Sequence, residues 1–349
     1  MKKTSTVLVS AVLFGQAFVW DAQAARTLHV GADKEYKNPS QAINAAQAGD
    51  TILIAEGVWS NDTVYCPKTP NVTIRGAGIG KTVIDGTAFN APSSAQGGPH
   101  LAGWKGLWVV TGTGWTIEGV TFRNAHIPAD AGANGAGLRY EADGDVTIRN
   151  CSFTDCQNGI LCGRLPNATM TIENCVFRAN GNHADRWGGD EGYTHNLYIG
   201  EIKELVFRNS VSDHAWRGHD LKSRAHKTTI EDSIFDDGHD GRSSYLVNCP
   251  NGGVITIRGC RFVQSETASN RVMISIGEEG PYPHTTLTES DNTFKDYRNG
   301  RIWNLAFPVG FAVTLTSNGC SAASAAARMR SARVVFDVTG AEMMCSVIA

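Results

Sequence analysis

The sequence predicts an all-β fold, a right-handed parallel β-helix with three short strands in each coil. A short template recurs along the chain, and a third apolar segment follows each copy before the next copy begins. Stacked repeats of this kind bury a continuous core that no single repeat could bury alone. The copies of the template are WTIEGVTF (115–122), VTIRNCSF (146–153), MTIENCVF (170–177), LVFRNSVS (205–212), TTIEDSIF (228–235) and ITIRGCRF (255–262).

Each copy of the template indicates a strand, a one-residue bend and a second strand. The bend position carries Gly, Asn or Asp in every copy, and these residue types tolerate a left-handed backbone. The next position is small in every copy, so we expect like residues to stack inside the core. Cys151, Cys175 and Cys260 are then packing residues, while Cys320 and Cys345 are the better candidates for a disulfide.

The segments between the copies supply the third strand of each coil, and coils of roughly 23 to 35 residues suit a β-helix. An antiparallel sandwich or a propeller would not hold a column of Asn and Gly bends in register with an inward Phe. The third strands are GLRYE (137–141), GILCG (159–163), NLYIG (196–200), DLKSR (220–224), YLVNC (245–249) and MISIG (273–277), and NVTIRG (71–76) and TLTESDNTF (286–294) are weaker copies of the template.

The N-terminus predicts a secretory signal peptide over residues 1–24. Two lysines precede an apolar run, and AQA (22–24) has the small-x-small form of a cleavage site. The alternatives are a buried helix or a membrane anchor, but the run is short for a bilayer and is interrupted by Gln16. We therefore expect a secreted or periplasmic protein with a β-helix domain over 25–300 and a C-terminal cap or tail over 301–349.

A short helix is expected to cap the first coil. Asn38 suits the N-cap position and Pro39 the first helical position, and the helix leads into a strand over 51–55. Covering the open end would protect unpaired strand edges from aggregation. The formal net charge of −3 gives no reason to expect a nucleic-acid partner, no later segment predicts a membrane span, and we expect a monomer.

One phrase is written on two successive coils. In YTHNLYIG (193–200) and RGHDLKSR (217–224), the aligned pairs are His195 with His219, Asn196 with Asp220, Leu197 with Leu221, and Tyr198 with Lys222. Neighbouring rungs of a parallel sheet lie about 4.8 Å apart. Because side chains alternate between faces, we expect Leu197, Ile199, Leu221 and Ser223 to point inward, and Asn196, Tyr198, Asp220, Lys222 and Arg224 to share one outer wall.

Further polar and aromatic residues are expected around this wall. The same face should carry Arg139 and Glu141 on an earlier coil and Tyr245 and Val247 on the next one. Loops at one edge of a rigid scaffold often carry function, and Arg binds carboxylates in a fork. The predicted partner is an acidic polysaccharide, and the candidate substrate-binding residues are Arg139, Arg217, Trp187, Trp216, Arg242 and Tyr245.

The chain resembles the pectate lyase-like superfamily of right-handed parallel β-helices. The resemblance rests on AINAAQAGDTILIAEGVW (42–59), the TIxNCxF copies and the Lys-Ser pair in DLKSRA (220–225). Within the superfamily the pattern is similar to the alginate lyase and chondroitinase B group, whose catalytic Lys lies in a Lys-Ser motif. That group places a catalytic Arg about where this chain has Val247, so Arg242 or Arg224 would have to substitute.

The resemblance implies β-elimination on a uronic-acid polymer. We expect Lys222 to be the base, with a pKa lowered by neighbouring cations. Tyr198 or His195 would protonate the leaving oxygen, His219 would stand beside them, and Arg224 or Arg217 would hold the carboxylate. Oxygen ligands suit calcium, so Asn196, Asp220 and Glu141 could hold a Ca²⁺ ion that neutralises the same group.

Other interpretations stay open at this point. The two histidines could cap the strands, Asp220, Lys222 and Arg224 could be an exposed ion-pair row that contributes little to stability, and Trp187 and Trp216 could pack a loop. A C5-epimerase shares the proton-abstraction step. A glycoside hydrolase is less well supported, because no Asn-Thr-Asp strand is present. A β-helix that binds polysaccharide without catalysis is the non-enzyme alternative.

Overall fold

The computed structural model describes residues 24–60, 62–89, 94, 100–132, 134–181 and 193–306, and the backbone of the segments 312–315, 333–339 and 342–348. Apart from Ala24, the predicted signal peptide lies outside these residues, as do Trp187 and Cys320. Within the described part of the chain, no helix has the length and apolar character needed to cross a bilayer.

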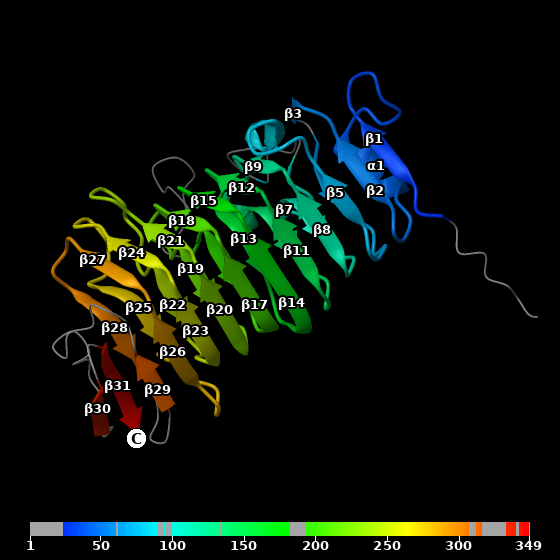
Figure 1. Ribbon diagram of the computed structural model, residues 1–349. Helices are drawn as coiled ribbons and strands as arrows, with labels where there is room; N and C mark the ends of the chain where they lie inside the picture. The colour runs from blue at the N-terminus through cyan, green and yellow to red at the C-terminus, as the bar shows by residue number, and fades with distance from the viewer. Residues whose placement is uncertain are drawn as a thin grey trace, which may run out of the picture.

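Three parallel sheets run along the molecule and confirm the predicted parallel β-helix (Figure 1). Sheet A contains β1 (Thr27–Val30), β2 (Thr51–Ile54), β5 (Thr73–Arg75), β8 (Trp115–Glu118), β11 (Val146–Arg149), β14 (Leu165–Glu173), β17 (Ile202–Arg208), β20 (Lys227–Glu231), β23 (Val254–Arg258) and β26 (Thr286–Ser290), then β29 (Ala312–Leu315), β31 (Glu342–Ile348) and β30 (Arg333–Thr339).

The other two sheets complete each coil. Sheet B contains β3 (Gly57–Trp59), β6 (Thr82–Asp85), β9 (Thr121–Arg123), β12 (Ser152–Thr154), β15 (Val176–Arg178), β18 (Val211–Asp213), β21 (Ile234–Asp236), β24 (Arg261–Gln264) and β27 (Thr293–Asp296). Sheet C contains β4 (Val64–Tyr65), β7 (Gly106–Val110), β10 (Ala136–Tyr140), β13 (Asn158–Cys162), β16 (Leu197–Ile199), β19 (Leu221–Ser223), β22 (Val247–Cys249), β25 (Val272–Ile276) and β28 (Arg301–Leu305).

The bends between sheets A and B adopt the left-handed backbone that their residue types predict. Their φ angles run from 47° at Asp232 to 70° at Gly119. Each bend turns the chain within one residue, so the strands on its two sides face different directions around the same core. The bend residues are Gly119, Asn150, Asn174, Asn209, Asp232 and Gly259. The small residues that follow them are buried, and the cysteines among them, Cys151, Cys175 and Cys260, are free thiols, as predicted.

A column of phenylalanines fills the core beside the bends. Phe122, Phe153 and Phe177 stack with ring centres 5.0 and 4.8 Å apart. The next copy of the template ends in Ser212 and not in Phe, and there Phe207 from sheet A fills the space, 6.1 Å from Phe177. Moving the ring across the core keeps the column continuous, because close packing does not tolerate an empty ring-sized space.

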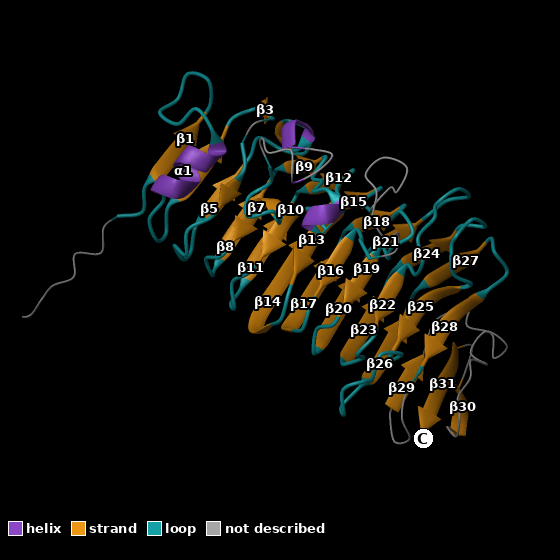
Figure 2. Ribbon diagram, turned by 180° about the vertical axis from the view of Figure 1, so that it is seen from behind, coloured by secondary structure: helices purple, strands orange, loops and turns teal. Residues whose placement is uncertain are grey.

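The two ends of the solenoid differ. The predicted capping helix is α1 (Pro39–Ala45), which lies against β1 and β2 and buries Ala42 and Ile43 (Figure 2). At the other end, β29 continues sheet A in parallel, and β31 and β30 add antiparallel strands. The sheets therefore continue past residue 300, where the template fades from the sequence.

Candidate functional site on the outer face of sheet C

One outward-facing ladder runs along sheet C. In the register of the strands, Tyr198 lies directly beside Lys222, as predicted from the repeated phrase. Both side chains are partly exposed, while Leu197, Ile199, Leu221 and Ser223 are buried. We call this row the sheet C ladder, and its members in order are Tyr65, Val109, Arg139, Leu161, Tyr198, Lys222, Asn248, Ser275 and Asn304.

Tyr198, Lys222 and Arg224 converge at the middle of this ladder. Nε of Arg224 donates a hydrogen bond of 2.9 Å to the Tyr198 hydroxyl. Nζ of Lys222 lies 5.8 Å from the centre of the Tyr198 ring, within the range of a cation–π contact. The three groups form a compact cluster in which a phenol, an amine and a guanidinium can reach the same ligand.

The surroundings of Lys222 act on the pKa of its ammonium in both directions, with a net lowering. Burial is the largest cause that lowers the pKa of its ammonium, and the nearby Arg224 charge acts in the same direction. Glu279 opposes both, because its carboxylate lies 3.4 Å from Nζ of Lys222. The same carboxylate lies 2.6 Å from Nη2 of Arg224. The predicted lowering by neighbouring cations is thus present, although burial is the larger cause.

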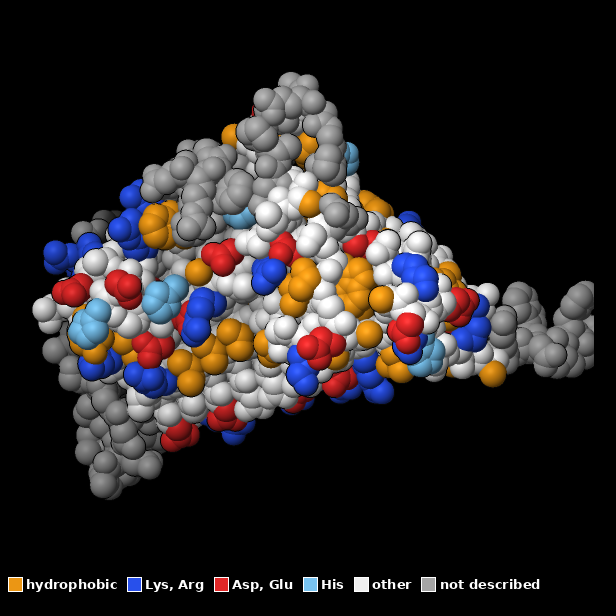
Figure 3. All heavy atoms as spheres, turned by 90° about the horizontal axis from the view of Figure 1, so that it is seen from above, with side chains coloured by type: hydrophobic (Ala, Val, Ile, Leu, Met, Phe, Trp, Pro, Cys, Tyr) orange, Lys and Arg blue, Asp and Glu red, His pale blue; other side chains and the backbone are white. Residues whose placement is uncertain are grey.

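A hollow of about 720 Å³ opens beside this cluster, next to Tyr198. Arg139, Leu161 and Tyr198 of the ladder line it, and exposed Tyr193 stands at its rim. The 3-10 turn η3 (Ala129–Ala131) contributes Ala129. Its size lies in the range of small-ligand sites. In Figure 3, which shows one face of the molecule, cationic, anionic and hydrophobic side chains lie intermixed.

The two histidines lie in register but are buried. Nδ1 of His195 accepts the backbone N–H of His219 at 2.9 Å, and Nδ1 of His219 accepts that of Tyr245 at 3.3 Å. The imidazole rings stack at 4.7 Å. Burial lowers the pKa of His195 well below its usual value and that of His219 to about 3. At neutral pH both rings are therefore neutral, with Nδ1 as a hydrogen-bond acceptor, and neither is an imidazolium that could act as the acid.

The outward placement expected for Asn196 and Asp220 is wrong. Both side chains are fully buried. Their strands begin one residue later, at Leu197 and Leu221, so these two residues lie in the corner between sheets B and C, where the alternation of a strand does not apply. The amide Nδ2 of Asn196 donates to Oδ1 of Asp220 at 3.0 Å.

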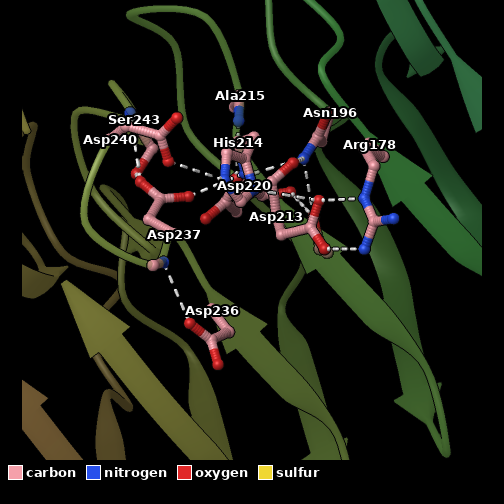
Figure 4. A network of polar contacts seen from close by, with 12 residues as sticks. Arg178, Asn196, Asp213, His214, Ala215, Asp220, Asp236, Asp237, Asp240 and Ser243 are labelled. Carbon is pink, nitrogen blue, oxygen red and sulfur yellow. Dashed lines mark hydrogen bonds and ion pairs between the residues drawn. The ribbon is translucent and has the colours of Figure 1, made fainter. Parts of the chain in front are cut away.

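A buried polar network surrounds Asp220 (Figure 4). Oδ1 of Asp220 also accepts the N–H of Ala215 at 3.0 Å. Asp237 accepts the N–H of His214 at 2.7 Å, and Asp213 pairs with Arg178 at 2.6 Å. Burial first, and then the charge of Asp237, raise the pKa of Asp220 well above its usual value. These surroundings therefore favour the protonated form of the acid.

The three residues expected to bind calcium do not form a common site. Asp220 and Asn196 are enclosed and bonded to each other, whereas Glu141 pairs with Lys105 at 2.7 Å and accepts a hydrogen bond from Tyr65. The described residues contain no group of three or more His, Cys, Asp or Glu side chains arranged to hold a metal ion. These three donors therefore do not fit a shared Ca²⁺ ion.

The remaining predicted binding residues divide between two places. Arg139 lines the hollow, and the half-buried Tyr245 stacks on His219 at 5.0 Å. Arg217 and Arg242 instead line a separate hollow of about 350 Å³. Trp216 lies under the guanidinium of Arg242, 4.5 Å from Cζ to the ring centre.

The expectation that Val247 lies on the outer face beside Lys222 is wrong. Leu221 pairs with Val247, so Val247 points into the core, and Asn248 is the neighbour of Lys222. Sequence reasoning also missed Glu279 and Asn251, whose Oδ1 accepts Nη1 of Arg224 at 2.6 Å. Both follow third strands in loops that carry no template, and no local pattern could have brought them to Lys222.

Comparison with known proteins supports the architecture. Residues 105–273 match the family model described as "Right handed beta helix region". A pectin methylesterase in complex with a hexasaccharide is similar in structure, with a TM-score of 0.51 and 12% identity over 87% of this chain and 95% of that one. A pectin methylesterase from Erwinia chrysanthemi has the same TM-score and identity over 88% and 95%.

A shorter similarity exists to a curated plant protein, "Probable pectinesterase/pectinesterase inhibitor 17" of Arabidopsis thaliana. The two are 32% identical over 122 residues, or 34% of this chain. The matched part spans about a fifth of that relative's length, 21%. Through its three parallel sheets and the match to the family model, the chain is shown to be a right-handed parallel β-helix protein.

Proposed function

We propose that the protein binds a uronic-acid polysaccharide along the sheet C ladder and cleaves it by β-elimination. The observation that carries this proposal is the convergence of Tyr198, Lys222 and Arg224 beside a hollow of about 720 Å³. An extended ladder that crosses successive coils suits a linear polymer. The polymer would be met in the periplasm or outside the cell, where the predicted signal peptide would direct the chain.

The three groups match the three requirements of the reaction. β-Elimination takes the proton from C5 of the uronate, forms the C4–C5 double bond and releases the C4 oxygen, which gains a proton. The guanidinium of Arg224 would hold the carboxylate in a fork. Lys222, whose pKa is lowered chiefly by burial, would take the C5 proton. The Tyr198 hydroxyl would protonate the leaving oxygen.

The hollow supplies the binding side of the proposal. Arg139 lies two rungs before Tyr198 on the same ladder, at a distance suited to a second carboxylate along the polymer. The Tyr198 ring offers a flat apolar surface to a sugar. The resemblance to the alginate lyase and chondroitinase B group, carried by the Lys-Ser pair, supports the same assignment of Lys222.

Ester hydrolysis on a pectin-type polymer is the second candidate. Both similar structures are pectin methylesterases, and the plant relative is named a pectinesterase. A carboxylate-based hydrolysis would need acids open to the hollow. Glu141 and Glu279 are engaged in ion pairs and Asp220 is enclosed. The described side chains therefore favour elimination, while the names of the similar proteins favour the esterase.

A substrate panel separates these reactions. Purified protein is incubated with polygalacturonate, methyl-esterified pectin and alginate, and each mixture is assayed for the ultraviolet absorbance of an unsaturated sugar, for methanol and for new reducing ends. We expect rising absorbance with at least one polymer. Methanol without absorbance would establish the esterase, and reducing ends without absorbance a hydrolase. Altered sugar composition without cleavage would indicate an epimerase, and binding without any product a non-catalytic protein.

A further inference from the structure

The carboxylate of Glu279 contacts both cations at the centre of the candidate site, Arg224 and Lys222. One carboxylate oxygen accepts Nη2 of Arg224 at 2.6 Å, and the other lies 3.4 Å from Nζ of Lys222. Arg224 and Lys222 are the groups that would meet the carboxylate of an acidic sugar. A carboxylate of the chain itself therefore stands where the proposed substrate would place its own.

The backbone that carries Glu279 is firmly attached, whereas its side chain is not enclosed. The N–H of Glu279 donates to the carbonyl of Pro250 at 2.9 Å, and its own carbonyl accepts Nδ2 of Asn251 at 3.3 Å. The Tyr282 hydroxyl donates to the carbonyl of Arg224 at 2.9 Å. The Glu279 side chain is 47% exposed. Rotation of this side chain would free both cations without moving the turn.

We propose that Glu279 is an internal competitor for the substrate carboxylate, which an acidic sugar must displace from Lys222 and Arg224. Half-exposed ion pairs are weakly held, so a carboxylate positioned by a polymer bound along the ladder can replace it. A neutral sugar offers no anion in exchange and would leave both cations with Glu279. The residue thus lowers affinity for carboxylated ligands and keeps Lys222 and Arg224 unavailable to neutral ones.

The inference rests on the proposed function for its ligand, but the blocking contact can be tested without a ligand. Glu279→Gln keeps the shape of the side chain and removes its charge. The matched control is Glu204→Gln, which removes the carboxylate that lies 2.8 Å from Lys227 on sheet A. The first measurement is the rate at which Lys222 is acetylated at neutral pH, followed by mass spectrometry of its peptide.

We expect Lys222 to be acetylated several-fold faster in Glu279→Gln than in the wild type, since its amine loses a partner that keeps it charged. The control should leave the Lys222 rate unchanged. Equal rates in wild type and Glu279→Gln would show that the carboxylate does not occupy the amine in solution, and would overturn the proposal whatever the protein binds.

The second measurement is calorimetric binding of polygalacturonate. We expect Glu279→Gln to bind several-fold more tightly than the wild type, with unchanged affinity in Glu204→Gln. Unchanged or weaker binding in Glu279→Gln would refute competition and make Glu279 a positioning residue. If faster acetylation is accompanied by no binding of polygalacturonate or alginate to any variant, the blocking contact stands and the proposed function fails.

Discussion

Sheets A and C have the same spacing and the same parallel register, but their outer faces differ in how charge is arranged. The outer ladder of sheet A alternates in sign over seven consecutive rungs: Arg75, Glu118, Arg149, Glu173, Arg208, Glu231 and Arg258. Neighbours pair along it, for example Arg149 with Glu118 at 3.0 Å and Arg258 with Glu231 at 2.9 Å.

The sheet C ladder has no such alternation. Arg139 and Lys222 have no carboxylate beside them in the ladder, and the acids that meet them, Glu141 and Glu279, come from outside it. In sheet A each charged side chain is neutralised by its neighbours in the ladder. In sheet C the cations are paired with acids from outside the ladder, and an acidic substrate could replace those acids. This difference in charge arrangement is the reason for placing the proposed site on sheet C and not on sheet A.

The largest effect is expected from removing the amine of the sheet C ladder. Lys222→Ala should lower turnover by about 10²–10⁴-fold, the usual contribution of a general base, with the melting temperature nearly unchanged because the side chain lies on the outer face of sheet C and outside the hydrophobic core. The sheet A control Lys227→Ala should retain full turnover. Comparable loss in both variants would remove the distinction between the faces.

Tyr198→Phe tests whether the phenol hydroxyl acts in catalysis or only in binding. It removes only the hydroxyl that accepts Nε of Arg224, and it keeps the ring that lines the hollow. If the phenol protonates the leaving oxygen, kcat should fall by roughly 10²-fold while KM changes little. A change confined to KM, measured by steady-state kinetics, would instead assign Tyr198 to binding alone.

The pH profile tests the state of Lys222. Only the neutral amine can take a proton, so the rate should rise with pH through the pKa of Lys222, which lies below the ordinary 10.5. Glu279 raises this pKa, and Glu279→Gln should therefore move the rising limb to lower pH. If the rising limb of the pH profile stays at the same pH in Glu279→Gln, Lys222 is not the base in the rate-determining proton transfer.

The raised pKa of Asp220 predicts how the free energy of unfolding depends on pH. Its pKa is raised in the folded protein, so between the unfolded pKa near 3.8 and the folded pKa the native state holds one more proton than the unfolded state. Stability should therefore fall with rising pH in this window, by up to about 1.4 kcal/mol per pH unit. Asp220→Asn should flatten this slope in denaturant titrations, and a slope equal to that of the wild type would show that Asp220 is ionised in the fold.

The smallest effect is expected on sheet A. Arg149→Ala breaks a partly exposed pair with Glu118, and such pairs contribute about 0–1 kcal/mol. Chemical denaturation should show a loss within that range, and polysaccharide turnover should be unaltered. A larger loss would mean that the alternating ladder behaves as a cooperative network.

The repeat made most of the fold predictable. The bend residues, the buried cysteines and the pairing of Tyr198 with Lys222 follow from the template, because stacking converts sequence position into spatial position. The expectation that Asn196 and Asp220 point outward is wrong because side chains alternate between faces only within a strand. Both residues lie one position before their strands begin. The template also could not show that Phe207 would replace the missing ring of Ser212.

The site was predictable only where it lies on strands. Glu279 reaches Lys222 from a loop two coils later, and its position depends on the path of that loop and not on any repeat. The aromatic stack of His195 and His219 was visible as an alignment, but its burial depends on packing in the corner of the coil. Side chains on loops and corners therefore required the structure.

Hydrogen–deuterium exchange with and without polygalacturonate tests the central claim most directly. We predict that the polymer protects amides in residues 193–200 and 219–224, around Tyr198 and Lys222 of sheet C, and leaves β11, β17, β20 and β23 of sheet A unchanged. Protection on sheet A, or binding that leaves residues 193–200 and 219–224 exchanging at their free rate, would contradict the account.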